Sequence, residues 1–223
     1  IVIKLGNMLR HFYEAEDLLV FGSGYSLALA SYKAMECGRT GMEFAVGIPG
    51  SIGGAVYMNA GAYDGEMQNI VNCVKVMDLQ GNERVLTAEE LNFGYRKTSL
   101  QNSGLIVTEV TLKMPSGNKD EIKSKMDDFS HRRISKQPLE MPSAGSMFKR
   151  PPGYFAGTLI DQAGLKGYTV GGAQISTKHA GFVVNVGGAT AADVLQLIKD
   201  VQTKIKAGVG VELQPEVLVI GEE

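Results

Sequence analysis

The chain has 223 residues, a formal net charge of -2 at pH 7 and an isoelectric point of about 6.0. This balance argues against a general binder of nucleic acid or anionic membranes, because such proteins carry an excess of basic side chains. Hydrophobic residues make up 44% of the chain, and no apolar run approaches the roughly 18 residues that a membrane-spanning helix needs. We therefore expect a globular protein with no nucleic-acid partner and no membrane insertion.

The two cysteines, Cys37 and Cys73, lack the CxxC or Cys/His spacing of zinc sites. We expect no metal, and free thiols in a reducing cytoplasm, with a disulfide between them as the alternative. The sequence starts at Ile1 rather than at a methionine, directly in a strand-like stretch. We expect a fragment whose N-terminus lies upstream.

Strand patterns dominate the first half of the chain. Alternating or apolar runs predict strands over 1–6 and 17–24, two strands within 70–86, and a strand over 104–114. Between them, helical spacing predicts a helix over 26–38 that ends at Gly38. Thr87 and Glu90 have the spacing of a capping box, which predicts a helix over 86–96.

The second half mixes helices and strands. A charged amphipathic helix is predicted over 119–137, with Ile122, Met126, Phe129 and Ile134 on its apolar face. A clearer helix is predicted over 189–210, with Gly208 as its stop and an apolar face of Val194, Leu195, Leu197, Ile198, Val201 and Ile205. A final strand is predicted over 211–221. The pattern changes near Pro115 and again in 137–142, which indicates two lobes of an α+β protein.

The segment 46–66, VGIPGSIGGAVYMNAGAYDGE, is rich in glycine and contains no lysine or arginine. It lacks the lysine of a Walker loop, and its first glycines have the wrong spacing for a dinucleotide-binding fingerprint. Backbone N–H groups without side chains can approach an anion closely, so the segment suits a diphosphate-containing cofactor. From spacing alone, a tightly packed Gly/Ala turn explains the segment equally well.

This segment resembles the flavin-binding segment of the UDP-N-acetylenolpyruvoylglucosamine reductase family. Three further blocks resemble that family in the same order, FGYRKTSL, QPLEMPSAGSMFKRPPGYFAGTLIDQAGLKG, and the region from GAQISTKHAGFVVN to QPEVLVIG. The resemblance runs almost without interruption from about Gly41 to Gly221 and fits the shorter form of the family. The family's Gly-x-Gly-Ser-Asn loop has no counterpart, so we expect the N-terminal part of the flavin domain to be missing from this chain.

The resemblance implies an α+β fold with two lobes. The first is a flavin-binding lobe of the PCMH/vanillyl-alcohol-oxidase type, N-terminally incomplete, over 1–134. The second is a smaller α+β lobe for the UDP-sugar over 135–212, and residues 213–223 form a last strand that returns to the first lobe. FAD would be held by Gly47, Ile48, Pro49, Gly50, Ser51, Gly53, Gly54, Ala55, Asn59, Gly61 and Ala62.

The reaction implied by the resemblance is the reduction of UDP-N-acetylglucosamine enolpyruvate to UDP-N-acetylmuramate, a peptidoglycan precursor, with FAD as cofactor and NADPH as hydride donor. Arg96 in FGYR would hold the charge of the developing enolate, because a guanidinium matches a carboxylate and stays charged. Ser146 would donate a proton to carbon. Glu216 would assist at the enolate, and Glu212 is its rival by position.

Basic and aromatic residues are the expected partners of a UDP-sugar with a diphosphate and a carboxylate. The candidates are Tyr95, Arg132, Lys136, Lys149, Arg150, Lys178 and His179, each of which could equally be an ordinary solvated or packed side chain. We expect a cytoplasmic monomer. Two alternatives remain open, namely another FAD-linked oxidoreductase on the same scaffold, and a truncated UDP-sugar-binding fragment without flavin activity.

Overall fold

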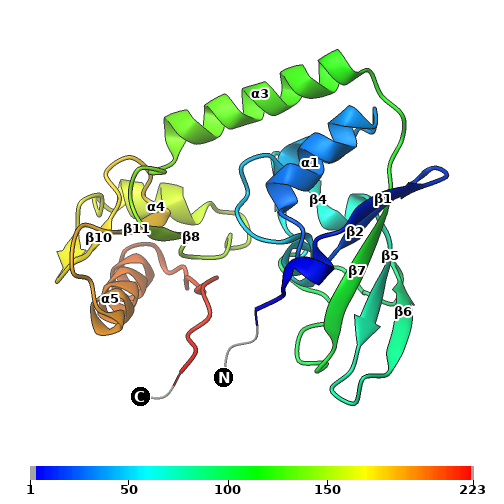
Figure 1. The fold of residues 1–223 in the computed structure, drawn as a ribbon. Helices are drawn as coiled ribbons and strands as arrows, with labels where there is room; N and C mark the ends of the chain where they lie inside the picture. The colour runs from blue at the N-terminus through cyan, green and yellow to red at the C-terminus, as the bar shows by residue number, and fades with distance from the viewer. Residues whose placement is uncertain (1–3, 222–223) are drawn as a thin grey trace. The chain divides into compact units, whose positions relative to one another are not determined.

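The computed structural model describes residues 4–221 and has the expected α+β composition. The chain divides into two compact units, Ile1–Arg132 and Arg133–Glu223 (Figure 1). The division falls two residues before the predicted end of the first lobe at residue 134. Each unit has its own hydrophobic core, so each is described by itself.

The first unit is built on a five-stranded antiparallel sheet in the order β1-β2-β7-β5-β6 (Figure 1). The central strand β7 alternates between buried and more exposed positions, as expected for a sheet with one face in the core. This sheet confirms the predicted strands over 17–24, 70–86 and 104–114. The strands are β1 (Phe12–Ala15), β2 (Leu18–Gly22), β5 (Val71–Met77), β6 (Glu83–Thr87) and β7 (Ile106–Lys113).

The first unit contains two helices beside this sheet, of which the second along the chain packs directly on it. Helix α1 (Leu27–Glu36) confirms the predicted first helix, and Gly38 follows it with a positive φ of 67°. The short helix α2 (Ile52–Tyr57), inside the glycine-rich segment, packs against β2 and β7, and α1 packs against α2. The remaining short elements of the unit are η1 (Asn7–Leu9), η2 (Glu43–Ala45), β3 (Gly61–Ala62), β4 (Gly65–Glu66) and η3 (Met67–Asn69).

Helix α3 (Lys119–Lys136) is the predicted charged helix. Its buried residues Ile122, Met126 and Phe129 pack with Val46, as the apolar pattern predicts. Ile134 was expected on the same face, yet its side chain is 59% exposed. The apolar face of α3 is therefore buried only along the part of the helix that lies in the first unit.

The second unit contains a four-stranded antiparallel sheet in the order β8-β11-β10-β9. Helix α5 (Ala191–Val209) packs on β9 and β10, and it starts with a capping box formed by Thr190 and Asp193. The helix ends at Gly210, with φ 71°, and not at the predicted Gly208. The other elements are β8 (Ser143–Ser146), α4 (Ala156–Gln162), β9 (Thr169–Val170), β10 (Ala173–Ile175) and β11 (Phe182–Asn185).

The predicted helix over 86–96 is wrong, for a reason visible in the backbone. Thr87 and Glu90 do form a reciprocal pair, with the Thr87 N–H donating to the Glu90 carboxylate at 2.8 Å and the Glu90 N–H to the Thr87 hydroxyl at 3.4 Å. Asn92 then adopts a left-handed φ of 44°, which stops the helix after one turn. Both hydrogen bonds of the capping box are present, but they stabilise a turn and not a helix.

The predicted strands at both ends also differ from the structure. Residues 1–3 lie outside the described part, and residues 4–6 form no strand. Residues 213–221 form no strand, and the only pairing among them is an isolated bridge between Pro215 and Phe148. Pro215 has no N–H to donate to a ladder, and Leu213 lies in the core of the second unit. The apolar face predicted for α5 is buried except at Val194, which is partly buried, and Leu195, which is 36% exposed.

Candidate cofactor and substrate sites

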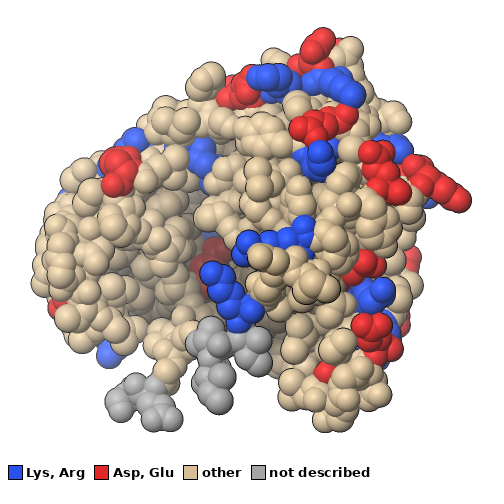
Figure 2. All heavy atoms as spheres, viewed as in Figure 1, with Lys and Arg blue, Asp and Glu red and all other residues tan. Residues whose placement is uncertain are grey.

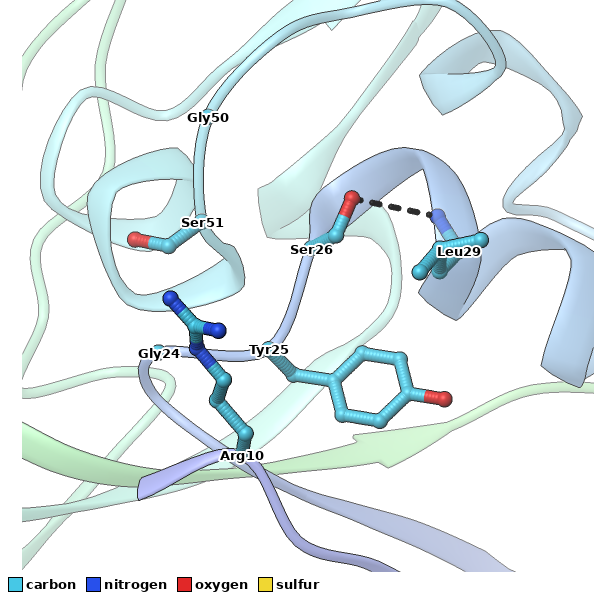
Figure 3. Close-up of a pocket in the computed structure, with 7 residues that line it drawn as sticks. All are labelled: Arg10, Gly24, Tyr25, Ser26, Leu29, Gly50 and Ser51. Atoms are coloured by element: carbon cyan, nitrogen blue, oxygen red, sulfur yellow. Dashed lines mark hydrogen bonds between the residues drawn. The ribbon is translucent and has the colours of Figure 1, made fainter. Parts of the chain in front are cut away.

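The first unit contains a cavity of about 500 Å³ at the meeting point of α1, α2 and the end of η1. Figure 3 shows the Arg10 guanidinium reaching toward Ser51, with the Tyr25 ring beside it. Two of the predicted cofactor residues, Gly50 and Ser51, are in its wall. The full lining is Arg10, Gly24, Tyr25, Ser26, Leu29, Gly50 and Ser51.

Two serines in the wall of this cavity each cap the start of a helix. Ser26 caps α1 by accepting from the Leu29 N–H at 3.5 Å, and Ser51 caps α2 by accepting from the Gly54 N–H at 3.3 Å. An antiparallel bridge joins Ser26 to Ser51. The positive ends of two helix dipoles therefore border one space, which is a favourable environment for an anion.

Arg10 adds a full positive charge to this environment. Its backbone is held in place because the Gly24 N–H donates to the Leu9 carbonyl at 2.7 Å and the Gly22 N–H to the His11 carbonyl at 2.9 Å. Among residues 4–221 the guanidinium of Arg10 makes no hydrogen bond or ion pair. An arginine that lines a cavity and makes no hydrogen bond or ion pair within the described residues is available to an anionic ligand.

The cavity suits the diphosphate part of FAD. A cation, two helix starts and glycine backbone supply the positive charge and close approach that a diphosphate needs. Beside the cavity, the Ser23 hydroxyl is buried and has no hydrogen-bond partner among residues 4–221. A Cβ on Gly53 would stand 2.7 Å from the Ser23 Cβ, so this glycine permits a close approach of two backbone segments.

Two of the predicted cofactor glycines have a left-handed backbone conformation. Gly47 and Gly50 have positive φ values of 73° and 120°, so they shape the turn that leads into α2.

The sequence patterns did not identify Arg10 or Tyr25 as site residues. Arg10 carries no local signal, because its position depends on backbone hydrogen bonds to residues 22–24. Gly24, Tyr25 and Ser26 lie where the predicted strand over 17–24 meets the predicted helix over 26–38, and this junction lines the cavity.

Asn59 is completely buried, and its side chain is engaged within the protein. Its Nδ2 donates to the Glu66 carboxylate and to the Gly94 carbonyl, each at 3.0 Å. Its Oδ1 accepts from the Gln68 N–H at 3.0 Å. The structure thus gives the Asn59 side chain a connecting role, between the glycine-rich segment and the turn that carries Arg96.

Arg96 is attached to the glycine-rich segment. Its Nη2 donates to the Gly61 carbonyl at 2.9 Å and its Nη1 to the Asn59 carbonyl at 3.3 Å. Its guanidinium also lies over the ring of Tyr95, 5.1 Å from the ring centre. The candidate catalytic arginine is therefore hydrogen-bonded to the candidate cofactor segment within the first unit.

Ser146 and Glu216 come together in the second unit. The Glu216 N–H donates to the Met147 carbonyl at 2.9 Å, next to the bridge between Phe148 and Pro215. Ser146 ends β8 one residue before Met147, and its hydroxyl donates to the Phe148 carbonyl at 3.4 Å. Two of the three candidate catalytic residues thus sit on paired segments of one unit, although they are far apart in sequence.

Three of the predicted substrate residues gather at the C-terminal end of α3. Lys136 is the last residue of the helix, and the Lys178 ammonium donates to the Ile134 carbonyl at 2.9 Å. Lys178 also lies 3.5 Å from the Glu140 carboxylate. His179 follows Lys178 in the chain and is partly buried. Lys136, Lys178 and His179 make up what we call the basic group of the second unit.

His179 is held in one tautomer. Its Nδ1 accepts from the Gly181 N–H at 3.0 Å, which leaves the ring proton on Nε2. Burial lowers the pKa of His179 below its ordinary value, and the nearby charges of Lys166 and Lys136 lower it further. At neutral pH the side chain is therefore an uncharged Nε2–H donor, suited to a phosphate or sugar oxygen.

The other predicted substrate residues lie elsewhere. Arg132 pairs with Asp128 at 2.7 Å on the surface of α3. The Arg150 guanidinium stacks over Phe155 at 4.0 Å from the ring centre, and the Lys149 N–H donates to the Gln214 carbonyl at 2.9 Å. Lys149 and Arg150 therefore belong with Ser146 and Glu216 rather than with the end of α3.

A second cavity of about 370 Å³ lies in the second unit, between β8, β11 and the start of α5. None of the predicted site residues lines it. Residues 4–221 contain no group of three or more His, Cys, Asp or Glu side chains arranged to hold a metal ion, and no helix among them combines the length and apolarity of a membrane span. Figure 2 shows acidic and basic side chains interspersed on the visible face, without a broad area of one sign.

Comparisons with known proteins agree with this geometry. Residues 1–87 match a family model described as FAD binding domain, and residues 137–220 match one described as UDP-N-acetylenolpyruvoylglucosamine reductase, C-terminal domain. The latter includes Ser146, Lys178, His179 and Glu216. Together the two matches cover most of both units.

Similar proteins carry the name of this reductase. A UDP-N-acetylenolpyruvoylglucosamine reductase of Clostridium perfringens is 51% identical over 223 residues, which is 100% of this chain and 73% of the relative. One of Geobacillus thermodenitrificans is 49% identical over the same 223 residues. A crystal structure of the reductase of Thermus caldophilus matches with a TM-score of 0.78 and 42% identity, over 88% of this chain and 71% of that one. The chain therefore belongs to the UDP-N-acetylenolpyruvoylglucosamine reductase family of FAD-dependent oxidoreductases.

Proposed function

We propose that this chain reduces the enolpyruvyl group of UDP-N-acetylglucosamine enolpyruvate to give UDP-N-acetylmuramate, with FAD as cofactor and NADPH as hydride donor. The observation that carries the proposal is the attachment of Arg96 to Gly61 and Asn59 of the glycine-rich segment. The same segment supplies Gly50 and Ser51 to the cavity that suits a diphosphate. We further propose a cytoplasmic monomer that acts in peptidoglycan synthesis.

In this proposal the first unit holds the cofactor. Arg10 and the starts of α1 and α2 bind the FAD diphosphate, and glycine backbone permits its close approach. When bound, FAD supplies the hydride chemistry, which no amino-acid side chain can perform. The chain itself supplies binding, orientation and charge.

Arg96 acts on the substrate carboxylate. An enol ether accepts a hydride only if its conjugated carboxylate can take up negative charge as an enolate. The planar Arg96 guanidinium matches the shape of a carboxylate, and it stabilises that charge more strongly in the transition state than in the ground state. Its hydrogen bonds to the carbonyls of Gly61 and Asn59 hold the guanidinium beside the candidate cofactor segment.

Ser146 and Glu216 complete the reaction in the second unit. Ser146 donates the proton that the enolate carbon requires, and to do so its hydroxyl gives up its hydrogen bond to the Phe148 carbonyl. Glu216 supports the same centre from the paired segment. The basic group, with Lys149 and Arg150, binds the diphosphate and sugar of the substrate.

The test measures NADPH oxidation that depends on UDP-N-acetylglucosamine enolpyruvate in the presence of FAD. Arg96→Ala should lower kcat about 100- to 1000-fold, the usual effect of removing one group that stabilises a developing anion. The matched control is Arg84→Ala, because Arg84 lies exposed on β6, and it should keep full activity. An unchanged kcat in Arg96→Ala would contradict the proposal, and absence of any substrate-dependent turnover would favour a UDP-sugar-binding fragment.

A further inference from the structure

Arg96 has an unusual backbone. Its φ is 54°, a left-handed conformation that is unfavourable for a residue with a Cβ atom. Such a conformation persists only where surrounding contacts impose it, and it is often found at functional sites. Two amide side chains make hydrogen bonds to this turn.

One amide acts on the residues before Arg96. Asn59, completely buried, donates from Nδ2 to the Gly94 carbonyl, two residues before Arg96. Its position is fixed because the Glu66 carboxylate and the Gln68 N–H occupy the rest of its side-chain amide. Its own carbonyl accepts from Arg96, so Asn59 holds the turn and the guanidinium together.

The other amide acts at Arg96 itself. Gln101 donates from Nε2 to the Arg96 carbonyl at 3.1 Å and to the Tyr57 carbonyl at 3.3 Å. Tyr57 is the last residue of α2, so this side chain ties the turn to the helix that follows the cofactor segment. Between the two amides, Gly94 and Lys97 exchange two backbone hydrogen bonds of 2.9 and 3.1 Å.

We propose that Asn59 and Gln101 are positioning residues that hold Arg96 in its left-handed conformation and so aim its guanidinium. This proposal rests on the proposed function, in which Arg96 stabilises the enolate. Without the two amides the turn can relax to a negative φ, and the guanidinium leaves the carbonyls of Asn59 and Gly61. A shift of about 1 Å in a catalytic group can lower turnover by about 100-fold.

Gln101→Met tests this most cleanly, because methionine has a similar length and no donor, and Gln101 lies in a partly exposed turn. We expect kcat to fall at least about tenfold, with KM and FAD affinity within about twofold. Gln80→Met is the matched control, since Gln80 is exposed in the β5–β6 turn, and it should behave as wild type. Gln101→Asn, which keeps the amide but is shorter, gives a second variant if the first is poorly folded.

A double-mutant cycle separates positioning from a general structural effect. If Gln101 acts through Arg96, adding Gln101→Met to Arg96→Ala should lower kcat no further. Additive losses would overturn the proposal, as would a wild-type kcat in both Gln101 variants.

Hydrogen exchange gives a readout that does not depend on catalysis. The amide hydrogens of Gly94 and Lys97 should exchange faster in Gln101→Met than in wild type, because their mutual hydrogen bonds open when the turn relaxes. Unchanged exchange at both amides would overturn the proposal even if turnover falls. If Arg96→Ala keeps full turnover while exchange does accelerate, the proposed function fails and the positioning of Arg96 stands.

Discussion

The cofactor region of the first unit and the basic group of the second unit are built in opposite ways. The first uses backbone, glycine and the side-chain amides of Asn59 and Gln101, and its catalytic candidate is held by internal hydrogen bonds. The second uses side chains at the end of a helix, of which Lys136 is exposed and His179 only partly buried. From this difference we expect the first region to be disturbed most by substitutions that add atoms. The second region should be disturbed most by substitutions that remove a charge.

The largest expected effect comes from a single methyl group in α2. Gly53→Ala would place a Cβ 2.7 Å from the Ser23 Cβ and 3.0 Å from the Ser23 carbonyl oxygen. Backbone cannot yield as a flexible side chain can, so we expect a loss of about 1–3 kcal/mol in the free energy of unfolding, and weaker FAD binding.

The neighbouring glycine is a matched control. In Gly54→Ala the new Cβ meets only the Ser51 hydroxyl, at 3.4 Å, and alanine favours a helix by about 1 kcal/mol over glycine. Urea unfolding of the two variants measures the difference. Equal stabilities would show that close backbone approach does not define this region.

The next effect concerns charge in the second unit. Lys178→Gln and Lys136→Gln should each raise KM for the UDP-sugar substrate by about tenfold, the loss of one charge-assisted hydrogen bond. The kcat and the melting temperature should change little, since both ammonium groups are at the surface. Lys204→Gln, on the outer side of α5 near Tyr168, serves as the control and should leave KM unchanged. A fall in kcat without a change in KM would contradict the assignment.

The smallest effect is on the pH dependence of stability. Because the pKa of His179 is lowered on folding, the unfolded chain binds a proton at higher pH than the folded chain does. The contribution of His179 to stability is therefore fully present above its unfolded pKa of about 6.5 and is lost as pH falls below that value. His179→Gln should flatten the stability profile between pH 7 and 5, as measured by urea unfolding at a series of pH values. An unchanged slope would show that His179 titrates normally.

Much of the fold could be predicted because its longer elements carry clear periodic patterns. Helices α3 and α5 and the strands β2, β5, β6 and β7 all follow the predicted segments closely. Short elements such as α4 and β9 could not be predicted, because they depend on tertiary pairing rather than on local pattern. The helix expected over 86–96 failed because a left-handed Asn92 ends its first turn.

The site was predictable only in part. Patterns alone left the glycine-rich segment with two readings, and the resemblance supplied the roles proposed for Arg96, Ser146 and Glu216. The structure added Arg10, whose place beside Ser51 depends on backbone contacts that no local sequence feature encodes. It also showed that the Asn59 side chain, for which the resemblance implied a cofactor role, makes hydrogen bonds within the protein.

The most direct test of the central claim follows the two half-reactions by visible absorption of the FAD-loaded chain. We expect a retained flavin band that NADPH bleaches and that UDP-N-acetylglucosamine enolpyruvate restores. In Arg96→Ala the bleaching should be unchanged and the recovery should be at least about 100-fold slower. A chain that retains no flavin, or one in which both half-reactions are unaffected by the loss of Arg96, would contradict the account.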